Sequence, residues 1–524
     1  MENRLSKEQL NNCDKAFLVD LVMNLQDTVD SLNSKMDLLL EQVMISKTKQ
    51  FQKQSETSEQ LSFFNEAESL KADIEEPSLE IVVPSYTRKR PKGKRDMDLS
   101  SFPVRIENHE LTDNELKEIF PDGYKHLPDE IYKKLDFHPA SFEVIEHHIK
   151  VYGDKKSDKI VRAEHPKEML NNSIATPSLT AAIINSKYTN QVPLYRQEQE
   201  FERNDVHISR QVMANWVISV SERYISLVYD RLKKELLKSK VVHADETPVM
   251  VTKDDREGMH KNYMWVYRTG SMCDAKQLII YDYQKTRKQD MPRKFLEGFK
   301  GNLVCDGYQV YHSLEDERPD EIKVAGCWAH ARRRFANVVK TTVAEKAKGS
   351  LASTALDMIA KIYHMDNMLL DLPKEERLEK RKLQVKPLVE SLFTWARTHK
   401  DDVLPNSETG KGFTYLLNQE KYLKTFLDDP EVPLDNNLAE IAIRSFCVGK
   451  KNWKLIDTVH GAEASAMLYS IVETAKANNL KVYEYFCYLL TEIPKHMDET
   501  SLAFIEDLLP WSENLPDKCR KKAQ

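Results

Sequence analysis

Residues 240–251 read KVVHADETPVMV, an apolar and β-branched run that predicts a strand of a central β-sheet. Asp245 comes directly after the first apolar residues of this run, at the predicted end of the strand. Residues 300–311, KGNLVCDGYQVY, repeat the arrangement, with Asp306 after a second apolar run. Because ligand sites of α/β sheets form where strands end, we expect both carboxylates at one edge of the sheet.

A third acid, Glu440, lies in residues 433–445, PLDNNLAEIAIRS, which are typical of the first turns of a helix. Two acids at strand ends and one on a helix suit a site for Mg²⁺ or Mn²⁺ in phosphoryl transfer, because these cations prefer carboxylate ligands. Three acids are enough to hold two ions, which makes all three both catalytic and metal-binding candidates. Zinc is not expected, since few thiols or imidazoles accompany the acids.

Each acid taken alone has an ordinary explanation. Asp245 also fits a residue of a strand end or turn, and Glu440 also fits a solvent-facing helix residue. Residues 435–437, Asp-Asn-Asn, also fit a simple helix cap. The prediction of an active site therefore depends on the sequence around all three acids.

The elements around the acids follow an α/β order. Further strands are predicted within residues 262–270, 275–284 and 322–328, with a helix within 291–299. Together with the two Asp-bearing strands, this order fits an α/β domain of the ribonuclease-H type. We predict that this core spans 239–345 and 431–478, that a helical insertion at 346–430 interrupts it, and that 479–524 form a C-terminal tail.

A heptad pattern opens the chain and predicts a coiled coil over residues 1–48. Its apolar positions, seven apart in each series, are Leu18, Leu25, Leu32 and Leu39, and Val22, Val29, Met36 and Val43. β-Branched residues at one position and leucine at the other favour a parallel two-stranded coiled coil. A homo-oligomer through residues 18–43 is therefore expected, the alternative being a single amphipathic helix packed on its own domain.

Residues 49–100 are polar and end in the basic run RKRPKGKR, which indicates a linker. Arg88, Lys89 and Arg90 of this run are candidates for phosphate or minor-groove contacts by a flexible arm. The alternative is a solvated charge run that keeps the linker extended.

Residues 101–160 form a small mixed segment, in which the alternation of FEVIEHHIKVYG at 142–153 suggests a strand pair. Residues 161–238 are helical, with a break at Asn204-Asp205 and a second helix that opens at Ser209, a candidate N-cap. This pattern resembles a helix-turn-helix, and we assign it to DNA binding. The candidate contacts on the second helix are Arg210, Gln211 and Asn215; the alternative is a purely structural helical bundle.

The composition is that of a protein with a substantial core and no membrane span. The chain has 524 residues, 41% of them hydrophobic, and no apolar stretch of membrane-spanning length or signal-peptide core. Its seven cysteines form no C-x-x-C pair, which argues against a disulfide scaffold and a clustered zinc site. These features favour a cytoplasmic protein.

The net charge of −6 does not suggest a nucleic-acid ligand, but local basic clusters do. His330, Arg332 and Arg333 follow a predicted buried strand and are candidates for steering a phosphate; a solvated helix face is the alternative. Lys450 and Lys451 are candidates for phosphate contacts. Trp453 is a candidate for stacking on a base, although core packing is slightly favoured for so large a ring.

Several of these motifs resemble transposases of the insertion-sequence-66 family. The resemblance rests on HADETPV, the later DGY, WAHARR at Trp328–Arg333, NN-x-A-E with GKKNW, and GAEASAMLYSIVETAK, and it extends over nearly the whole chain. It implies a DDE recombinase with Asp245, Asp306 and Glu440 at the catalytic positions. It also implies that the enzyme hydrolyses a phosphodiester at the element end, joins the freed 3′-hydroxyl to target DNA, and works with small accessory proteins of the same element.

The chain departs from the family pattern in two places. Relatives commonly carry C-x-x-C pairs ahead of the region near Leu127–Ile145, whereas HELTDNELKEIFPDGY contains no cysteine. The family's AERAIRP is AEIAIRS here, which removes a positive charge at Ile441 but keeps Arg444 as a candidate DNA contact. Neither departure changes the acids.

Two other functions stay open at this point. One is a ribonuclease-H-like nuclease that cuts DNA without joining it, and the other is a DNA-binding protein with an inert catalytic domain. The presence of all three acids counts against the second alternative.

Overall fold

The computed structural model describes residues 14–29, 36, 142–153, 160–163, 166–254, 256, 260–272, 276–341 and 349–522. They belong to two compact units, one of Met1–Asp73 with Lys167–Gln524 and one of Ile74–Pro166. The predicted basic cluster at Arg88, Lys89 and Arg90 lies outside the described residues, as does the cysteine-free segment HELTDNELKEIFPDGY.

In the smaller unit, the described residues contain a short antiparallel ladder. β1 (Val151–Gly153) pairs with β2 (Ile160–Arg162), and Tyr152 lies opposite Val161. Residues 142–150 form no strand, so the predicted strand pair within 142–153 is wrong in its boundaries. The second strand of the pair comes instead from residues further along the chain, Ile160–Arg162.

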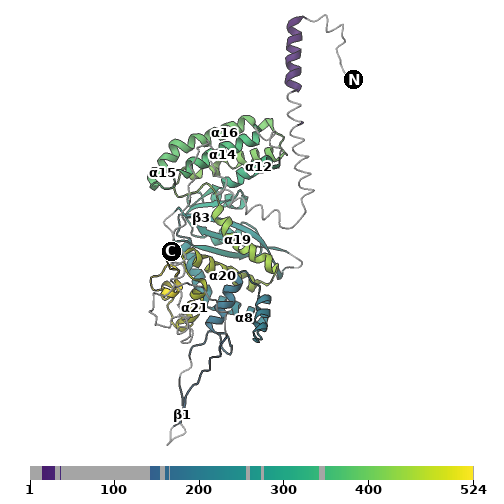
Figure 1. The fold of residues 1–524 in the computed structure, drawn as a ribbon. Helices are drawn as coiled ribbons and strands as arrows, with labels where there is room; N and C mark the ends of the chain where they lie inside the picture. Colours follow the sequence, from purple (N-terminus) through teal and green to yellow (C-terminus); the bar gives the residue numbers. More distant parts are fainter. Residues whose placement is uncertain are drawn as a thin grey trace, which may run out of the picture. The chain divides into compact units, whose positions relative to one another are not determined.

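The larger unit is built on a mixed β-sheet (Figure 1). Its strand order is β5 (Ile279–Gln284), β4 (Lys261–Thr269), β3 (Val241–Lys253), β6 (Gly301–Cys305) and β7 (Ile322–Gly326). β3, β4 and β5 are antiparallel neighbours, whereas β6 is parallel to both β3 and β7. A short strand, β8 (Ile456–Thr458), runs parallel to the far end of β3. The five strands predicted for the α/β core therefore all form, and with the helices they make a mixed α/β fold.

Alternate residues of the central strands face two different cores, as the pleat of a β-strand requires. Val242 and Leu303 belong to a core that the sheet shares with the helices of residues 177–236, before β3, and with those that follow residue 436. Val241 and Val304 belong to a second core, which the sheet shares with α12 (Trp328–Thr341) and the helices after it. The sheet is thus buried on both faces, which explains why its parallel strands are almost wholly apolar.

On the first face, α20 (Val459–Ala477) covers the edge strand β5. Ser470 Oγ accepts a hydrogen bond from the backbone N–H of Tyr281 at 2.7 Å, and Thr474 Oγ1 accepts one from Ile279 at 3.0 Å. These hydroxyls satisfy backbone donors that an edge strand would otherwise present to another chain. α19 (Asn437–Trp453) lies against β3 and β4 on the same face.

The second face carries the residues predicted as an insertion, and from residue 349 on they are largely helical (Figure 1). The helices are α14 (Leu351–Asn367), α15 (Lys374–Lys380), α16 (Lys386–His399), α17 (Glu408–Asn418) and α18 (Glu420–Leu423). Arg381 is fully buried among them, and its Nε donates to Asp366 Oδ1 at 2.7 Å. The indole N–H of Trp328 donates to the carbonyl of Leu423 at 2.8 Å, which ties α12 to this group.

The helices before the sheet include the predicted helix-turn-helix pair, α7 (Leu194–Arg203) and α8 (Arg210–Val220). Ser209 is the N-cap of α8, as predicted, and its Oγ accepts a hydrogen bond from Val212 N at 3.3 Å. Further α-helices are α6 (Pro177–Ile184), α9 (Ser226–Leu236), α10 (Asp290–Phe295), α11 (Gln309–Glu317), α21 (Val482–Glu492) and α22 (Ile505–Leu508), and residues 15–29 near the N-terminus are also helical. Within the described parts of the chain, every helix is too short or too polar to cross a membrane.

Candidate active site

Asp245 lies in the middle of β3 and not at its end, which corrects the prediction from the sequence. Its parallel neighbour β6 pairs with β3 only as far as His243, opposite Val304. The antiparallel neighbour β4 continues to pair as far as Met250, opposite Lys261, so the strand extends beyond the acid. Asp245 therefore marks the point where the parallel pairing ends, which is where α/β sites form.

Asp306 directly follows β6, as predicted. Its Oδ1 accepts a hydrogen bond from the backbone N–H of Tyr308 at 2.9 Å. A short Asp side chain commonly holds its own chain in this way two residues further on. The bond fixes the carboxylate at the turn between β6 and α11.

Glu440 projects from the first turn of α19 and is 3% exposed, so it is not the solvent-facing residue of the ordinary explanation. Its Oε1 lies 3.7 Å from His330 Nδ1 and 3.8 Å from an Arg333 guanidinium nitrogen. His330 and Arg333 both belong to α12. Two elements that are far apart in sequence thus meet at this carboxylate.

The three acids interact electrostatically. Burial, followed by the charges of Glu246, Asp306 and Glu440, raises the pKa of Asp245 well above its usual value. Burial also raises the pKa of Asp306, against the opposing effects of the Tyr308 N–H and of Arg287 and Arg333. A cation would relieve the unfavourable burial of so many negative charges, and oxygen ligands of this kind fit Mg²⁺ or Mn²⁺.

Asn436, directly before α19, connects the Glu440 helix to the strand of Asp245. Its side chain donates to the carbonyl of Ala244 at 2.8 Å, and its Oδ1 lies 3.0 Å from His243 Nδ1. Its backbone N–H donates to Cys327 Sγ at 3.2 Å. Asn436 therefore links three elements, and its side chain makes no capping bond to its own helix. The neighbouring Asp435 does act at the helix start, where its Oδ1 accepts a hydrogen bond from Asn437 N at 3.1 Å.

A thiol and an imidazole accompany Glu440, contrary to the expectation that few such groups surround the acids. Ligand atoms of Cys327, His330 and Glu440 all lie within 4.8 Å of one another. Burial and the charges of Arg333 and Arg334 lower the pKa of His330 to about 3. His330 is therefore neutral at physiological pH and does not act as a cation towards a phosphate. The C-x-x-H spacing at the start of α12 is the signal in the sequence that marks this group.

A second buried acid next to Asp245 was missed in the sequence. Glu246 Oε2 accepts a hydrogen bond from the Tyr311 hydroxyl at 2.6 Å, and Oε1 accepts one from Arg287 Nε at 2.8 Å. The spacing of HADET offers no hint of these partners, because Arg287 and Tyr311 come from later segments.

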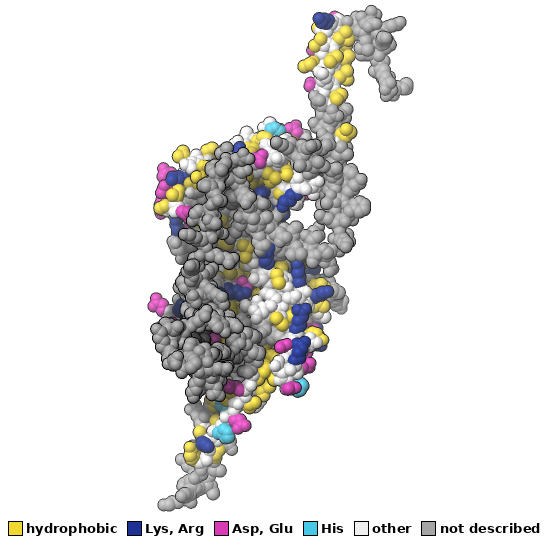
Figure 2. Space-filling view, in the orientation of Figure 1, with side chains coloured by type: hydrophobic (Ala, Val, Ile, Leu, Met, Phe, Trp, Pro, Cys, Tyr) yellow, Lys and Arg dark blue, Asp and Glu magenta, His cyan; other side chains and the backbone are white. Residues whose placement is uncertain are grey.

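The predicted DNA contacts fall into separate groups. Arg210, Gln211 and Asn215 are exposed on α8, and the Arg210 guanidinium lies 5.3 Å from the ring centroid of Tyr195. Lys451 is exposed near the end of α19. Figure 2 shows Lys and Arg side chains gathered on the surface over α8 and the end of α19.

Other predicted contacts are partly buried. Arg332, Arg333 and Arg444 are half-buried on α12 and α19. Lys450 donates to the carbonyl of Pro248 at 2.8 Å. The ring of Trp453 lies 6.5 Å from that of Tyr469, between centroids, and packs against the core, which agrees with the alternative of core packing.

A mixed sheet buried on both faces, with clustered carboxylates where its parallel pairing ends, defines an α/β protein with an enzyme-like acidic site. A family model described as "Transposase IS66 family" matches residues 172–464, and one described as "IS66 C-terminal element" matches residues 470–511. The first match spans more than half of the chain, so the chain belongs to the IS66 family of transposases. Membership implies an insertion-sequence transposase that processes and binds DNA.

Three relatives from Sinorhizobium fredii are similar over most of the chain, and each is described as an uncharacterized protein. The protein y4qI is 27% identical over 388 residues, which cover 72% of this chain and 70% of the relative. The protein y4jD is 27% identical over 360 residues, 67% of this chain and 69% of the relative. The protein y4hP is 25% identical over 448 residues, 82% of this chain and 78% of the relative.

Proposed function

We propose that this transposase cleaves DNA at the ends of its element and joins the freed 3′-hydroxyls to target DNA at Asp245, Asp306 and Glu440. The observation that carries the proposal is that the charges of Asp306, after β6, and Glu440, on α19, both act on Asp245 of β3 and help to raise its pKa. A buried acid whose pKa is raised by burial and by neighbouring acids, as that of Asp245 is, is typical of functional sites.

The donor set fits two divalent ions, Mg²⁺ or Mn²⁺, held by the three carboxylates, and DDE-type transposases generally use divalent metal. Such ions, when bound, would activate the attacking oxygen and stabilise the leaving one. The chain's own residues hold the acids in place: the Tyr308 N–H orients Asp306, and Asn436 holds the start of the Glu440 helix against β3.

We further infer that the sheet is ribonuclease-H-like. Three antiparallel strands followed by two parallel ones, with acids on β3 and after β6, support this assignment. The core then comprises residues 239–345 and 431–478, interrupted by the helices of 346–430. In the same scheme, residues 161–238 contact the element ends through Arg210, Gln211 and Asn215, and residues 479–524 form the tail.

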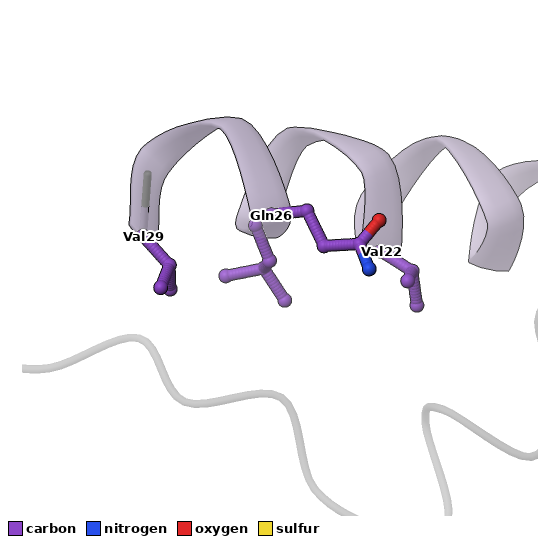
Figure 3. A pocket seen from close by; sticks show the side chains of 4 residues that line it. Val22, Gln26 and Val29 are labelled. Atoms are coloured by element: carbon purple, nitrogen blue, oxygen red, sulfur yellow. The ribbon is translucent and has the colours of Figure 1, made fainter. Parts of the chain in front are cut away.

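Self-association through the N-terminal heptads belongs to the same proposal. Residues 15–29 are helical, and their Val22, Leu25 and Val29 side chains are 52–55% exposed. Figure 3 shows Val22, Gln26 and Val29 projecting from one side of this helix, where they line a pocket together with Leu25. Such an apolar stripe suits a second copy of the same helix.

The test of the active site is strand transfer with the element's own ends. Asp245→Asn, Asp306→Asn and Glu440→Gln should each lower the rate on the order of 1,000-fold or more, because each variant weakens metal stabilisation worth several kcal/mol. End binding, measured in Ca²⁺, should stay within a few fold. Asp282→Asn, a carboxylate on β5 that makes no contact with the three acids, is the matched control and should transfer strands normally.

Two outcomes would contradict the proposal. Normal strand transfer by the three variants would show that the acids are not the active site. Release of ends by the unmodified protein without any joining to a target would favour a nuclease that cuts only.

A further inference from the structure

Glu246, next to Asp245 on β3, holds an arginine beside the three acids. Its side chain is 2% exposed, and both of its oxygens have partners. Oε1 accepts hydrogen bonds from Nε and a terminal nitrogen of Arg287, and Oε2 accepts one from the Tyr311 hydroxyl. A carboxylate that accepts two donors of one guanidinium fixes the plane of that group.

Tyr308 provides the second support for Arg287. The guanidinium carbon lies 3.7 Å from the centroid of the Tyr308 ring, and the Tyr308 hydroxyl donates to the Arg287 carbonyl at 2.9 Å. The backbone N–H of the same tyrosine donates to Asp306 Oδ1. Arg287 is therefore held in one orientation by residues that also position a member of the acid cluster.

The arginine is accessible although its support is buried. The Arg287 side chain is 40% exposed, compared with 15% for Arg333, which reaches Glu440 from α12. Both arginines lower the pKa of Asp306, so both charges act on the acid cluster. A guanidinium has five N–H donors. Glu246 accepts one bond from Nε and one from a terminal nitrogen of Arg287, so the other N–H groups can bind a ligand.

We propose that Arg287 binds a phosphate of the DNA strand that enters the cluster of Asp245, Asp306 and Glu440, and that Glu246 is a positioning residue acting through Arg287. The inference rests on the proposed function. A preorganised planar fork is suited to phosphate oxygens, and a fixed charge stabilises negative charge that develops during phosphoryl transfer. Arg287 and Arg333 then provide two cationic groups at the acids.

The test uses the full-length protein and a duplex copied from the end of its own element. Binding is measured in Ca²⁺ over a range of salt concentrations, and strand transfer is measured in Mg²⁺. Arg287→Ala should reduce the slope of log K against log salt by about 1, the value for one lost phosphate contact. It should also lower the rate of strand transfer by about 100-fold. Arg287→Lys should restore the slope but only part of the rate, because it keeps the charge and loses the fork.

Glu246→Gln keeps a partner for Tyr311 but loses the ion pair with Arg287. It should lower the rate without reducing the salt slope, and it should cause no further loss when Arg287 is already alanine, since its role runs through Arg287. Arg293→Ala is the matched control, because Arg293 on α10 also pairs with a glutamate, Glu317. This variant should leave both the slope and the rate unchanged.

The outcomes separate this inference from the proposed function. If the unmodified protein joins ends and needs the three acids, but Arg287→Ala has an unchanged slope and rate, Arg287 is not a DNA contact and only this inference fails. An additive loss in the Glu246→Gln/Arg287→Ala double variant would refute the positioning role. If Arg287→Ala does not fold, as judged by circular dichroism, an unchanged rate in Arg287→Lys would overturn the inference.

Discussion

Burial raises the pKa of several carboxylates in this protein, but the surroundings of each differ. Asp245 has three acidic neighbours whose charges add to the effect of burial. Asp282 on β5 has its pKa raised to about 6 chiefly by burial, and its only hydrogen-bond partner among the described residues is Gln284, at 2.8 Å. Asp245 thus belongs to a cluster that a cation would stabilise, whereas the pKa of Asp282 is raised mainly by burial.

Asp282→Asn is expected to stabilise the fold more at pH 7.5 than at pH 4.5. The pKa of Asp282 is about 6 in the folded protein, compared with the ordinary value of 3.8. Between pH 3.8 and pH 6 the folded protein therefore keeps a proton on Asp282 that the unfolded protein has lost. Stability is therefore lost as pH rises from about 4 to about 6 and stays lower above that range. The difference corresponds to at most about 3 kcal/mol at pH 7.5.

Urea unfolding at the two pH values measures this effect. The exposed Asp316→Asn is the control and should change the free energy of unfolding by less than about 0.5 kcal/mol at either pH. An equal gain for Asp282→Asn at both pH values would contradict the explanation by protonation.

At the scale of elements, the position of α19 determines whether Glu440 meets the other acids. The helix is held at its start by Asn436, which is 1% exposed and bonds to the carbonyl of Ala244, the residue before Asp245. Burial lowers the pKa of its other partner, His243, to about 3, so this imidazole is neutral and serves as a fixed hydrogen-bond partner. Buried polar links of this kind fix the relative position of the elements that they join.

Asn436→Ala should lower strand transfer by about 10- to 100-fold, the usual effect of removing a residue that orients a metal ligand. It should also destabilise the fold by about 1–3 kcal/mol, because buried groups lose their partners. Asn478→Ala is the matched control, since Asn478 at the end of α20 also makes two side-chain bonds, to Gln277 and Thr474. The control should lose stability but transfer strands at the rate of the unmodified protein. Equal strand-transfer rates for the two variants would show that Asn436 does not position the Glu440 helix.

At the scale of the whole molecule, the N-terminal helix at residues 15–29 carries an apolar surface that is exposed among the residues that the structure describes. Phe17, Val22, Leu25 and Val29 are each at least half exposed. Exposed apolar stripes of this kind mark contact sites for other chains. The heptad predictions at Leu32, Leu39 and Val43 lie outside the described residues, so the length of the contact stays a prediction.

The full-length variant with serine at Val22, Leu25 and Val29 should have a lower mass in multi-angle light scattering than the unmodified protein. The three changes remove the apolar stripe that a second helix would cover. The variant with serine at Asp20 and Asp27 changes the opposite side of the helix and should keep the mass of the unmodified protein. An unchanged mass in the triple variant would exclude self-association through this helix.

Local patterns in the sequence were sufficient for most elements. The alternation and β-branching of residues 240–251 indicated β3, and Ser209 was correctly predicted as the cap of α8. Strand and helix propensities depend on residues that are close in the sequence, so the order of residues is enough to predict them. The predicted strand boundaries were wrong where a neighbouring strand determines them. β3 extends past Asp245 because β4 continues to pair with it.

The contacts around the acids had no such local signal. Glu246 meets Arg287 and Tyr311, and Glu440 meets His330, only because loops and helices from distant segments fold onto the same end of the sheet. The chain's order of residues was thus enough to nominate three acids and the elements that carry them. Their shared burial, the arginines beside them and the neutral state of His330 follow from the packed fold, because desolvation and charge interaction depend on distances in space and not on separation along the chain.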